Sequence, residues 1–397
     1  MQLCLGVLYA WAVFRGPLAQ LHGWSQSQTM APFRYSTLFF TVGMILGGFW
    51  QDRKGPRLVG SAGGALLAAG CLLAALLGHT PAGLIFSYGV VGGLGVGFGY
   101  VTPIATCIKW FPDKRGAIVG LAVMGFGAGP LLLAPLLERL IGSDPARFAE
   151  TIPRTFMILA VVFFVFVIGA AQVFRVPPPG WKPAGWTPRG STRAAKESFS
   201  PREMLLTWQF WALWLIYFLG TSVGITAIAE SSPQVRAMAG PAALFSGGTA
   251  LGLMSVFNGA GRLSWGALSD RIRRNRVAVL MFAAQVAACL FLLRNPSGFI
   301  ELVSGLCVAA FAYGGFLALM PAFTADYFGP EHLGANYGIL FTAWGLCGFL
   351  VPGYFAALMD RARQAGSLAA GYNQVYFTLA VFAALGIALA LAVRKPR

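Results

Sequence analysis

Residues 48–57 have the sequence GFWQDRKGPR, and residues 266–274 have the sequence GALSDRIRR. Each is a short charged stretch between long apolar segments. Asp52 and Asp270 occupy the same place in the two stretches, 218 residues apart, and each is followed directly by an arginine. A charged motif that recurs at a fixed offset indicates an internal repeat, and therefore two structurally similar halves.

The chain around these stretches is too apolar for a soluble protein. Hydrophobic residues make up 57% of the 397 residues, charged residues only 11%, and the mean hydropathy is +0.69. Soluble domains carry about 25% charged residues. The net charge of +16 does not indicate a nucleic-acid partner, since such binding needs a solvated basic face.

Apolar segments long enough to cross a bilayer, about 20 residues each, fall into two groups of six. They span 1–20, 32–51, 57–78, 82–107, 116–140, 153–174, 205–228, 242–267, 277–294, 298–325, 333–358 and 372–393. We predict an all-α polytopic membrane protein with twelve transmembrane helices in two pseudo-symmetric six-helix bundles. The predicted domains are 1–174 and 205–397, joined by the linker 175–204, which is rich in Pro and basic residues.

Further residues align at the offset of 218. A proline followed by an acidic residue is a rarer pair than a glycine in a chain with 51 Gly, so chance is a poor explanation. The aligned positions are Pro103 with Pro321, Pro112-Asp113 with Pro330-Glu331, and Gly116, Gly120 and Gly127 with Gly334, Gly338 and Gly345. Parallel repeats of this kind place a substrate site near the membrane midplane, between the halves.

Lys and Arg predict the orientation in the membrane. Most of the 29 lie in the linker, the C-terminal tail and the predicted loops 2–3, 4–5 and 8–9, all on one side. Cytoplasmic loops carry an excess of basic residues. We therefore expect both termini and the linker in the cytoplasm, and the protein in the cell inner (plasma) membrane. The six Cys lie in apolar segments without paired spacing, which predicts buried thiols rather than disulfides.

The stretch 48–57 resembles the loop signature of the major facilitator superfamily, and 266–274 resembles its second copy, with Arg273 where that family usually has Gly. Three further stretches are similar to the branch that contains monocarboxylate transporters and oxalate:formate antiporters: LYAW at 8–11, WFPDKRG at 110–116 and NGAGR at 258–262. The resemblance covers essentially the whole chain. It implies a secondary transporter of small carboxylates that works by alternating access.

Arg262 is the leading candidate for substrate binding. It precedes Asp270 by eight residues, so it lies about 12 Å deep in a predicted helix. A charge there costs at least about 2.5–3.5 kcal/mol, and every Asp and Glu is predicted near a loop or helix end. A guanidinium matches a carboxylate with two parallel hydrogen bonds, and the resemblance implies a carboxylate-binding Arg here. The alternative is that Arg262 snorkels to the interface or caps helix carbonyls.

Asn258 lies one turn before Arg262 on the same face. We expect it to orient Arg262 or bind substrate, with helix packing as the alternative. The resemblance implies an Asp with a role in proton coupling at this position in animal monocarboxylate transporters. Because Asn does not titrate, a coupled proton must be carried elsewhere or by the substrate.

Aromatic and thiol side chains complete the predicted pocket. Tyr9, Tyr100 and Tyr313 lie in predicted helices 1, 4 and 10, which line the cavity in this superfamily. A phenol can hydrogen-bond a carboxylate while its ring excludes water. Trp344 and Cys347 are further candidates, and Trp344 occupies the position where the resemblance implies a second cation, a Lys, in the oxalate exchangers. One cation instead of two favours a monovalent anion.

Asp52, Arg53, Asp270 and Arg271 are candidates for a cytoplasmic charge latch between helices that rearrange during transport. A role in topology and folding is equally compatible with the pattern. The three His residues lie at loops or helix ends, and no nucleophile, base and orienting group occur together. We therefore expect no catalytic residue, no metal site, no cofactor and no enzyme activity, with a monomer as the default state.

The sequence predicts a transporter of small monocarboxylates such as L-lactate and pyruvate, coupled to protons by symport. Moving a bare anion into a cell works against about 2.3 kcal/mol per charge per 100 mV of membrane potential, and a co-transported proton cancels that charge. Anion exchange of the oxalate:formate type is the alternative. A transporter-like sensor or a membrane-embedded enzyme is a remote one.

Overall fold

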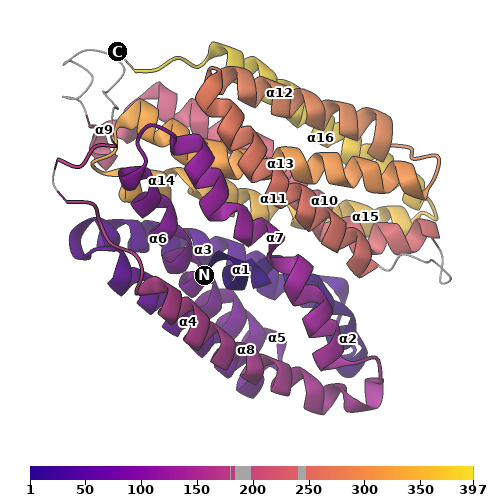
Figure 1. Ribbon diagram of the computed structural model, residues 1–397. Coiled ribbons are helices and arrows are strands. Elements are labelled where there is room, and N and C mark those ends of the chain that lie inside the picture. The colour runs from indigo at the N-terminus through magenta and orange to yellow at the C-terminus, as the bar shows by residue number, and fades with distance from the viewer. Residues whose placement is uncertain (179, 184–197, 240–246, 397) are drawn as a thin grey trace.

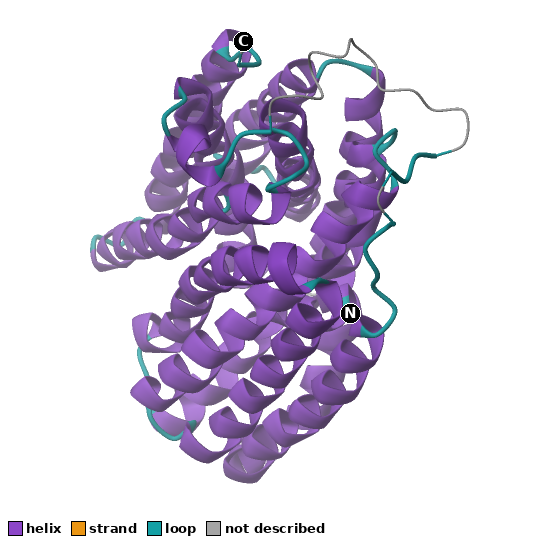
Figure 2. Ribbon diagram, turned by 90° about the vertical axis from the view of Figure 1, so that its left-hand side faces the viewer, coloured by secondary structure: helices purple, strands orange, loops and turns teal. Residues whose placement is uncertain are grey.

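The computed structural model describes residues 1–178, 180–183, 198–239 and 247–396, and the regular structure in these ranges is helical (Figures 1 and 2). The first half contains α1 (Gln2–Leu5), η1 (Gly6–Trp11), α2 (Ala12–His22), α3 (Gln26–Lys54), α4 (Pro56–Leu77), α5 (Pro81–Leu84), η2 (Ile85–Gly92), α6 (Gly93–Trp110), α7 (Arg115–Ile141), η3 (Pro145–Arg147) and α8 (Phe148–Ala171). The second half contains α9 (Pro201–Leu205), α10 (Trp208–Ala239), α11 (Gly247–Arg271), α12 (Arg274–Ala287), η4 (Ala288–Leu293), α13 (Phe299–Phe328), α14 (Leu333–Leu340), α15 (Thr342–Gln364) and α16 (Leu368–Ala392).

Within these described ranges the helices make twelve membrane-length segments, six on each side of the linker. Consecutive short elements run on as single segments: α1 to α2, α5 to α6, α12 to η4, and α14 to α15. Figure 1 shows the two halves as separate bundles, one coloured indigo to magenta and the other orange to yellow. The prediction of an all-α membrane protein with twelve helices is confirmed.

Ten of these segments are long and apolar enough to cross a membrane by their own composition, whereas α3 and α11 are not. The offset of 218 residues relates these two helices to each other. Each packs against the opposite bundle, α3 against α14 and α15, and α11 against α7. Their polar side chains are therefore covered largely by protein rather than lipid, which explains their low hydropathy.

Local signals explain where several helices begin and end. Ser25 begins α3 with a capping box to Gln28, in which backbone N–H groups and side-chain oxygens pair reciprocally. Gly55, with φ of 85°, ends α3, and Pro56 begins α4. The helix 32–51 predicted from the sequence is therefore longer in the structure and includes Asp52.

Other boundaries also differ from those predicted. The segment predicted as 205–228 continues as α10 to Ala239, and the segment predicted as 333–358 is divided at Phe341 into α14 and α15. Half of the linker, residues 179 and 184–197, lies outside the described residues. Its last described part leads into α9, where the backbone N–H of Ser200 donates to the Glu203 carboxylate at 2.7 Å. Hydrogen bonds from Ser200 lower the pKa of Glu203.

The repeat recurs in the contacts between the bundles. A Cβ atom on Gly266 of α11 would collide with the carbonyl oxygen of Gly116 on α7, and one on Gly48 of α3 with that of Gly334 on α14. The offset relates Gly48 to Gly266 and Gly116 to Gly334. Glycines at both places let the backbones approach closely. We call these two contacts the α7/α11 seam and the α3/α14 seam, the latter continuing along α15.

We call the two ends of the molecule the linker end and the far end. The linker end carries Asp52 and Asp270, and linker residues contact it: the indole N–H of Trp181 donates to the carbonyl of Trp110 at 3.1 Å. The far end carries residues 142–147, which connect α7 to α8.

Candidate functional site

Arg262 lies at the α7/α11 seam and is completely buried. Its Nε donates to Oδ1 of Asn258 at 2.9 Å, and its Nη1 donates to the Tyr100 hydroxyl at 3.2 Å and to the carbonyl of Val123 at 3.1 Å. Its Nη2 is buried without a hydrogen-bond partner. The structure thus brings Arg262, Asn258 and Tyr100 together and leaves one guanidinium nitrogen, Nη2, without a hydrogen-bond partner.

A second network lies beside the first. The hydroxyls of Tyr9 and Tyr313 are 2.6 Å apart, and the indole N–H of Trp344 donates to the Tyr313 hydroxyl at 2.8 Å. All three side chains are buried. They come from η1, α13 and α15, so both bundles contribute to one chain of polar groups.

The aromatic ring of Phe126 joins the two networks. Its centroid is 5.4 Å from the Arg262 guanidinium, 5.1 Å from the ring of Tyr9 and 5.0 Å from the ring of Tyr100. Phe40 packs on Tyr100, Phe126 and Trp344, with centroids 5.0 to 5.8 Å apart. The guanidinium and the phenols therefore lie within an aromatic wall that excludes water.

The sequence did not identify Phe126 or Phe40 as site residues. The repeat contained a usable signal: the offset relates Phe126 to Trp344 and Phe40 to Asn258. Residues equivalent to two predicted site residues lie on the opposite bundle and face the same centre. In a chain with 32 Phe, composition alone does not separate such a ring from lipid-facing ones.

Two glycines make room for the arginine. A Cβ on Gly127 would collide with Oδ1 of Asn258 and lie 2.8 Å from Nε of Arg262. A Cβ on Gly314 would collide with the Asn258 carbonyl and lie 3.2 Å from Cγ of Arg262. Neither position tolerates a larger side chain without displacing the guanidinium.

Cys347 is buried one turn after Trp344 in α15, with its sulfur 3.4 Å from the hydroxyl of Ser222. It therefore belongs to the α10 side of the site and makes no hydrogen bond to Arg262. All six cysteines are free thiols, although Cys4 and Cys107 are only partly buried.

Charge is scarce around the site. Arg262 is the one Lys or Arg with a buried side chain among the residues that the structure describes. Over the same ranges, no carboxylate pairs with it, and no group of three or more His, Cys, Asp and Glu could hold a metal ion. Among the described residues, the site therefore contains one buried cation and no second one.

At the linker end, Asp270 crosses the α7/α11 seam. Its carboxylate accepts from the backbone N–H groups of Gly116 at 3.0 Å and Ala117 at 2.8 Å, in the first turn of α7. Its cationic neighbour is Arg274, at 3.4 Å. A carboxylate at a helix N-terminus is stabilised by the unpaired N–H groups and the helix dipole.

Asp52 occupies the equivalent place at the α3/α14 seam. It accepts from the backbone N–H of Ala335, at the start of α14, at a longer 3.3 Å, and pairs with Lys109 at 3.4 Å. Arg53 and Arg271, predicted as parts of the same latch, are exposed instead. The cations beside the carboxylates are Lys109 and Arg274, which the motif did not single out.

The bundles also touch on the other side of the site. Towards the far end, Nε of Arg34 on α3 donates to the carbonyl of Phe349 on α15 at 3.1 Å. The bundles therefore contact each other both on the linker-end side of Arg262 and on its far-end side.

The model of the Major Facilitator Superfamily matches residues 3–352 and, a second time, 246–397. The chain belongs to this superfamily. The matched family consists of transporters, so the protein is a multi-pass membrane transporter and not an enzyme.

Relatives agree with the branch that the motifs indicated. The chain is 28% identical over 391 residues to the oxalate:formate antiporter of Oxalobacter formigenes, covering 98% of this chain and 88% of that protein. It is 29% identical over 361 residues to apicoplast pyruvate carrier 1 of Toxoplasma gondii, covering 76% of this chain and 64% of that protein. The fold is similar to that of the proton:xylose symporter XylE, with a TM-score of 0.69, 16% identity, and 97% and 93% of the two chains covered.

Proposed function

We propose that this transporter carries small monocarboxylates such as L-lactate and pyruvate by proton symport. The observation that carries the proposal is the buried Nη2 of Arg262, which has no hydrogen-bond partner within the aromatic wall formed around Phe126 and Phe40. A buried donor without a partner is costly, and a carboxylate would satisfy it. Because Nε and Nη1 are held by Asn258, Tyr100 and Val123, the guanidinium is fixed before substrate arrives.

The polarity of the site favours a substrate with one charge. Trp344 fills the place where the family resemblance implies the second cation of the oxalate exchangers, and it donates to Tyr313 instead. A second carboxylate would enter a site without a second buried cation and would be left unpaired. We propose that the hydroxyls of Tyr9 and Tyr313, which bond each other in this structure, hydrogen-bond the hydroxyl or keto group of lactate or pyruvate.

Coupling to protons follows from charge. A monocarboxylate on Arg262 compensates the one buried guanidinium, so the loaded and empty sites differ by one negative charge. An accompanying proton cancels the work against the membrane potential. Asn258 does not titrate, so the proton enters with the substrate or on a group outside the Arg262 network.

Anion exchange is the second candidate, and the similarity to the oxalate:formate antiporter favours it. An exchanger needs no proton carrier, because the returning anion balances the charge.

For alternating access, we propose that the linker end and both termini face the cytoplasm of a plasma membrane. Asp270 and Asp52, each at the N-terminus of a helix in the opposite bundle, then hold the cytoplasmic side closed. Opening to the cytoplasm breaks these contacts.

Uptake by purified protein in liposomes tests the proposal. Labelled lactate, pyruvate, formate and oxalate are each supplied with and without an inward proton gradient. We expect the gradient alone to drive accumulation of lactate or pyruvate. Uptake that requires an anion loaded inside would establish exchange instead, and preference for oxalate would refute the single-cation argument.

Arg262→Lys tests the recognition mode. It keeps the charge, but a single ammonium cannot hold Asn258, Tyr100 and Val123 and also offer the free donor of Nη2, so the affinity for lactate should fall. A Lys variant with unchanged affinity would exclude recognition by the guanidinium.

A further inference from the structure

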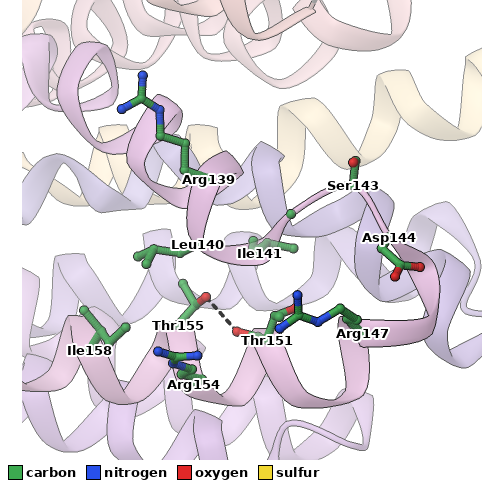
Figure 3. Close-up of a pocket in the computed structure, with 11 residues that line it drawn as sticks. Arg139, Leu140, Ile141, Ser143, Asp144, Arg147, Thr151, Arg154, Thr155 and Ile158 are labelled. Atoms are coloured by element: carbon green, nitrogen blue, oxygen red, sulfur yellow. Dashed lines mark hydrogen bonds between the residues drawn. The ribbon is translucent and has the colours of Figure 1, made fainter.

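A cavity of about 460 Å³ lies at the far end, away from Arg262. It is formed by the last turn of α7, the connection 142–147 and the first turns of α8 (Figure 3). Three of its lining side chains are the arginines Arg139, Arg147 and Arg154, and one is Asp144. The central site uses none of them.

The three guanidiniums are available to a ligand, with Arg147 and Arg154 on the side of Thr151 and Arg139 pointing away from them (Figure 3). All three are exposed, and none forms a hydrogen bond or ion pair within the part of the chain that the structure describes. The Asp144 carboxylate accepts from the backbone N–H of Ala146 at 3.0 Å. The cavity therefore carries an excess of positive charge, at the end of the molecule where basic residues are scarce.

A buried hydroxyl without a partner lines the same cavity. Thr151 is only 7% exposed, and its Oγ1 is buried without a hydrogen bond. The hydroxyl of Thr155, by contrast, donates to the Thr151 carbonyl at 2.7 Å (Figure 3). A helical Thr hydroxyl can bond the carbonyl of the preceding turn, and buried polar groups normally have partners. The free hydroxyl and the arginines together indicate a site for an anion.

Two exposed apolar strips lead to this cavity. Leu132 and Leu136 precede Arg139 on α7 at helical spacing and are 62% and 43% exposed. On α8, Val161 and Val165 continue the line of Arg154 towards the membrane interior and are 66% and 58% exposed. Residues three and four apart share one helix face. An anion in the cavity would thus lie at the end of an exposed apolar surface that lipid acyl chains can cover.

We propose that this cavity binds the phosphate headgroup of an anionic phospholipid in the leaflet at the far end. The guanidinium forks of Arg147 and Arg154 match phosphate oxygens. The Thr151 hydroxyl donates the remaining hydrogen bond, and the acyl chains lie along the two strips. The proposal is independent of the transported substrate.

Thermal unfolding of the delipidated protein in detergent tests the site. Phosphatidylglycerol should raise the melting temperature by several degrees. Phosphatidylcholine, whose headgroup is neutral overall, and inorganic phosphate, which has no acyl chain, should raise it far less. An equal rise with inorganic phosphate would overturn the lipid assignment in favour of a small-anion site, and no difference between the two lipids would overturn the site itself.

Variants locate the effect. Arg139→Gln, Arg147→Gln and Arg154→Gln, singly and combined, should reduce the number of phosphatidylglycerol molecules retained in native mass spectrometry. Thr151→Val, which keeps the shape and removes the hydroxyl, should weaken retention by about threefold to tenfold. Arg276→Gln removes an exposed arginine at the linker end and is the matched control. Retention that is unchanged in Thr151→Val and in all three single variants, or that falls equally in Arg276→Gln, would overturn the proposal, and these single changes do so even if the combined variant fails to fold.

Discussion

The two seams between the bundles share one backbone plan but differ in the chemistry that they carry. At the α7/α11 seam, Gly120 lies against the carbonyl of Arg262. At the α3/α14 seam, its equivalent Gly338 lies against the carbonyl of Met44. The offset relates Met44 to Arg262, so one seam buries a charge where the other buries a thioether. The repeat thus provides two similar close contacts between the bundles, and the residues that differ at one of them include the proposed substrate-binding arginine.

The largest expected effect comes from making the two seams alike. Arg262→Met places the residue of the α3/α14 seam in the α7/α11 seam. Truncating one partner of a buried charge pair costs about 2–5 kcal/mol, so lactate affinity, measured by binding to the purified protein, should fall at least about 30-fold. Met44→Leu, a volume-conserving change at the equivalent position, should leave it unaltered. Wild-type affinity in Arg262→Met would remove Arg262 from the site.

Adding a second cation at position 344 tests whether the single charge of the site excludes dicarboxylates. Trp344→Lys should let oxalate compete for the site, because both carboxylates would then find a positive partner. Lactate affinity should fall about fivefold, since the hydrogen bond to Tyr313 is lost. Trp344→Phe should show the same fall without any gain of oxalate binding. Competition assays measure both, and oxalate binding gained by the Phe variant would contradict the charge argument.

Gly127→Ala and Gly345→Ala are equivalent changes in the two seams. The first forces Asn258 and Arg262 to move, whereas the second meets chiefly the Thr41 side chain. Overpacking costs about 1–3 kcal/mol. Lactate affinity should therefore fall about tenfold in Gly127→Ala and less than about twofold in Gly345→Ala. Equal losses in both variants would show that the seams contribute to binding through packing alone.

The carboxylates at the linker end should affect the conformational equilibrium rather than substrate binding. Asp270 accepts two backbone hydrogen bonds at the helix N-terminus and Asp52 accepts one longer one. Such contacts contribute about 0.3–1 kcal/mol each, and up to about 2 kcal/mol when partly buried. Asp270→Asn should shift the population towards the open linker end by up to about 30-fold, and Asp52→Asn by no more than about fivefold. Distances between spin labels on α3 and α14 measure the shift, and a larger effect of Asp52→Asn would reverse the ranking.

Most of the fold was predictable from the sequence, because crossing a bilayer constrains both length and polarity. Segment number and the repeat followed from apolar runs and the recurring Asp-Arg pair. The full extents of α3 and α10 were missed, since both helices continue past the apolar segments that the hydropathy pattern marks. The division at Phe341 carries no composition signal.

The site was predictable in part for the same reason. Arg262 is conspicuous because a deep charge is costly, and Asn258 follows from its spacing on the same helix. Phe126, Phe40 and Gly127 were missed, because their roles depend on contacts with the opposite bundle: Phe126 with Arg262, Phe40 with Trp344 and Gly127 with Asn258. The partners of the carboxylates were missed likewise: Lys109 and Arg274 replace the adjacent Arg53 and Arg271.

The sequence by itself determined the class of protein, the two halves and the one deep cation, since each follows from the energetic cost of placing polar groups in hydrocarbon. Only the tertiary structure decided which face of that cation stays unpaired, which rings enclose it and which helix ends the two carboxylates reach. These depend on how closely one backbone approaches another, and that distance is set by glycines and side chains brought together from both bundles.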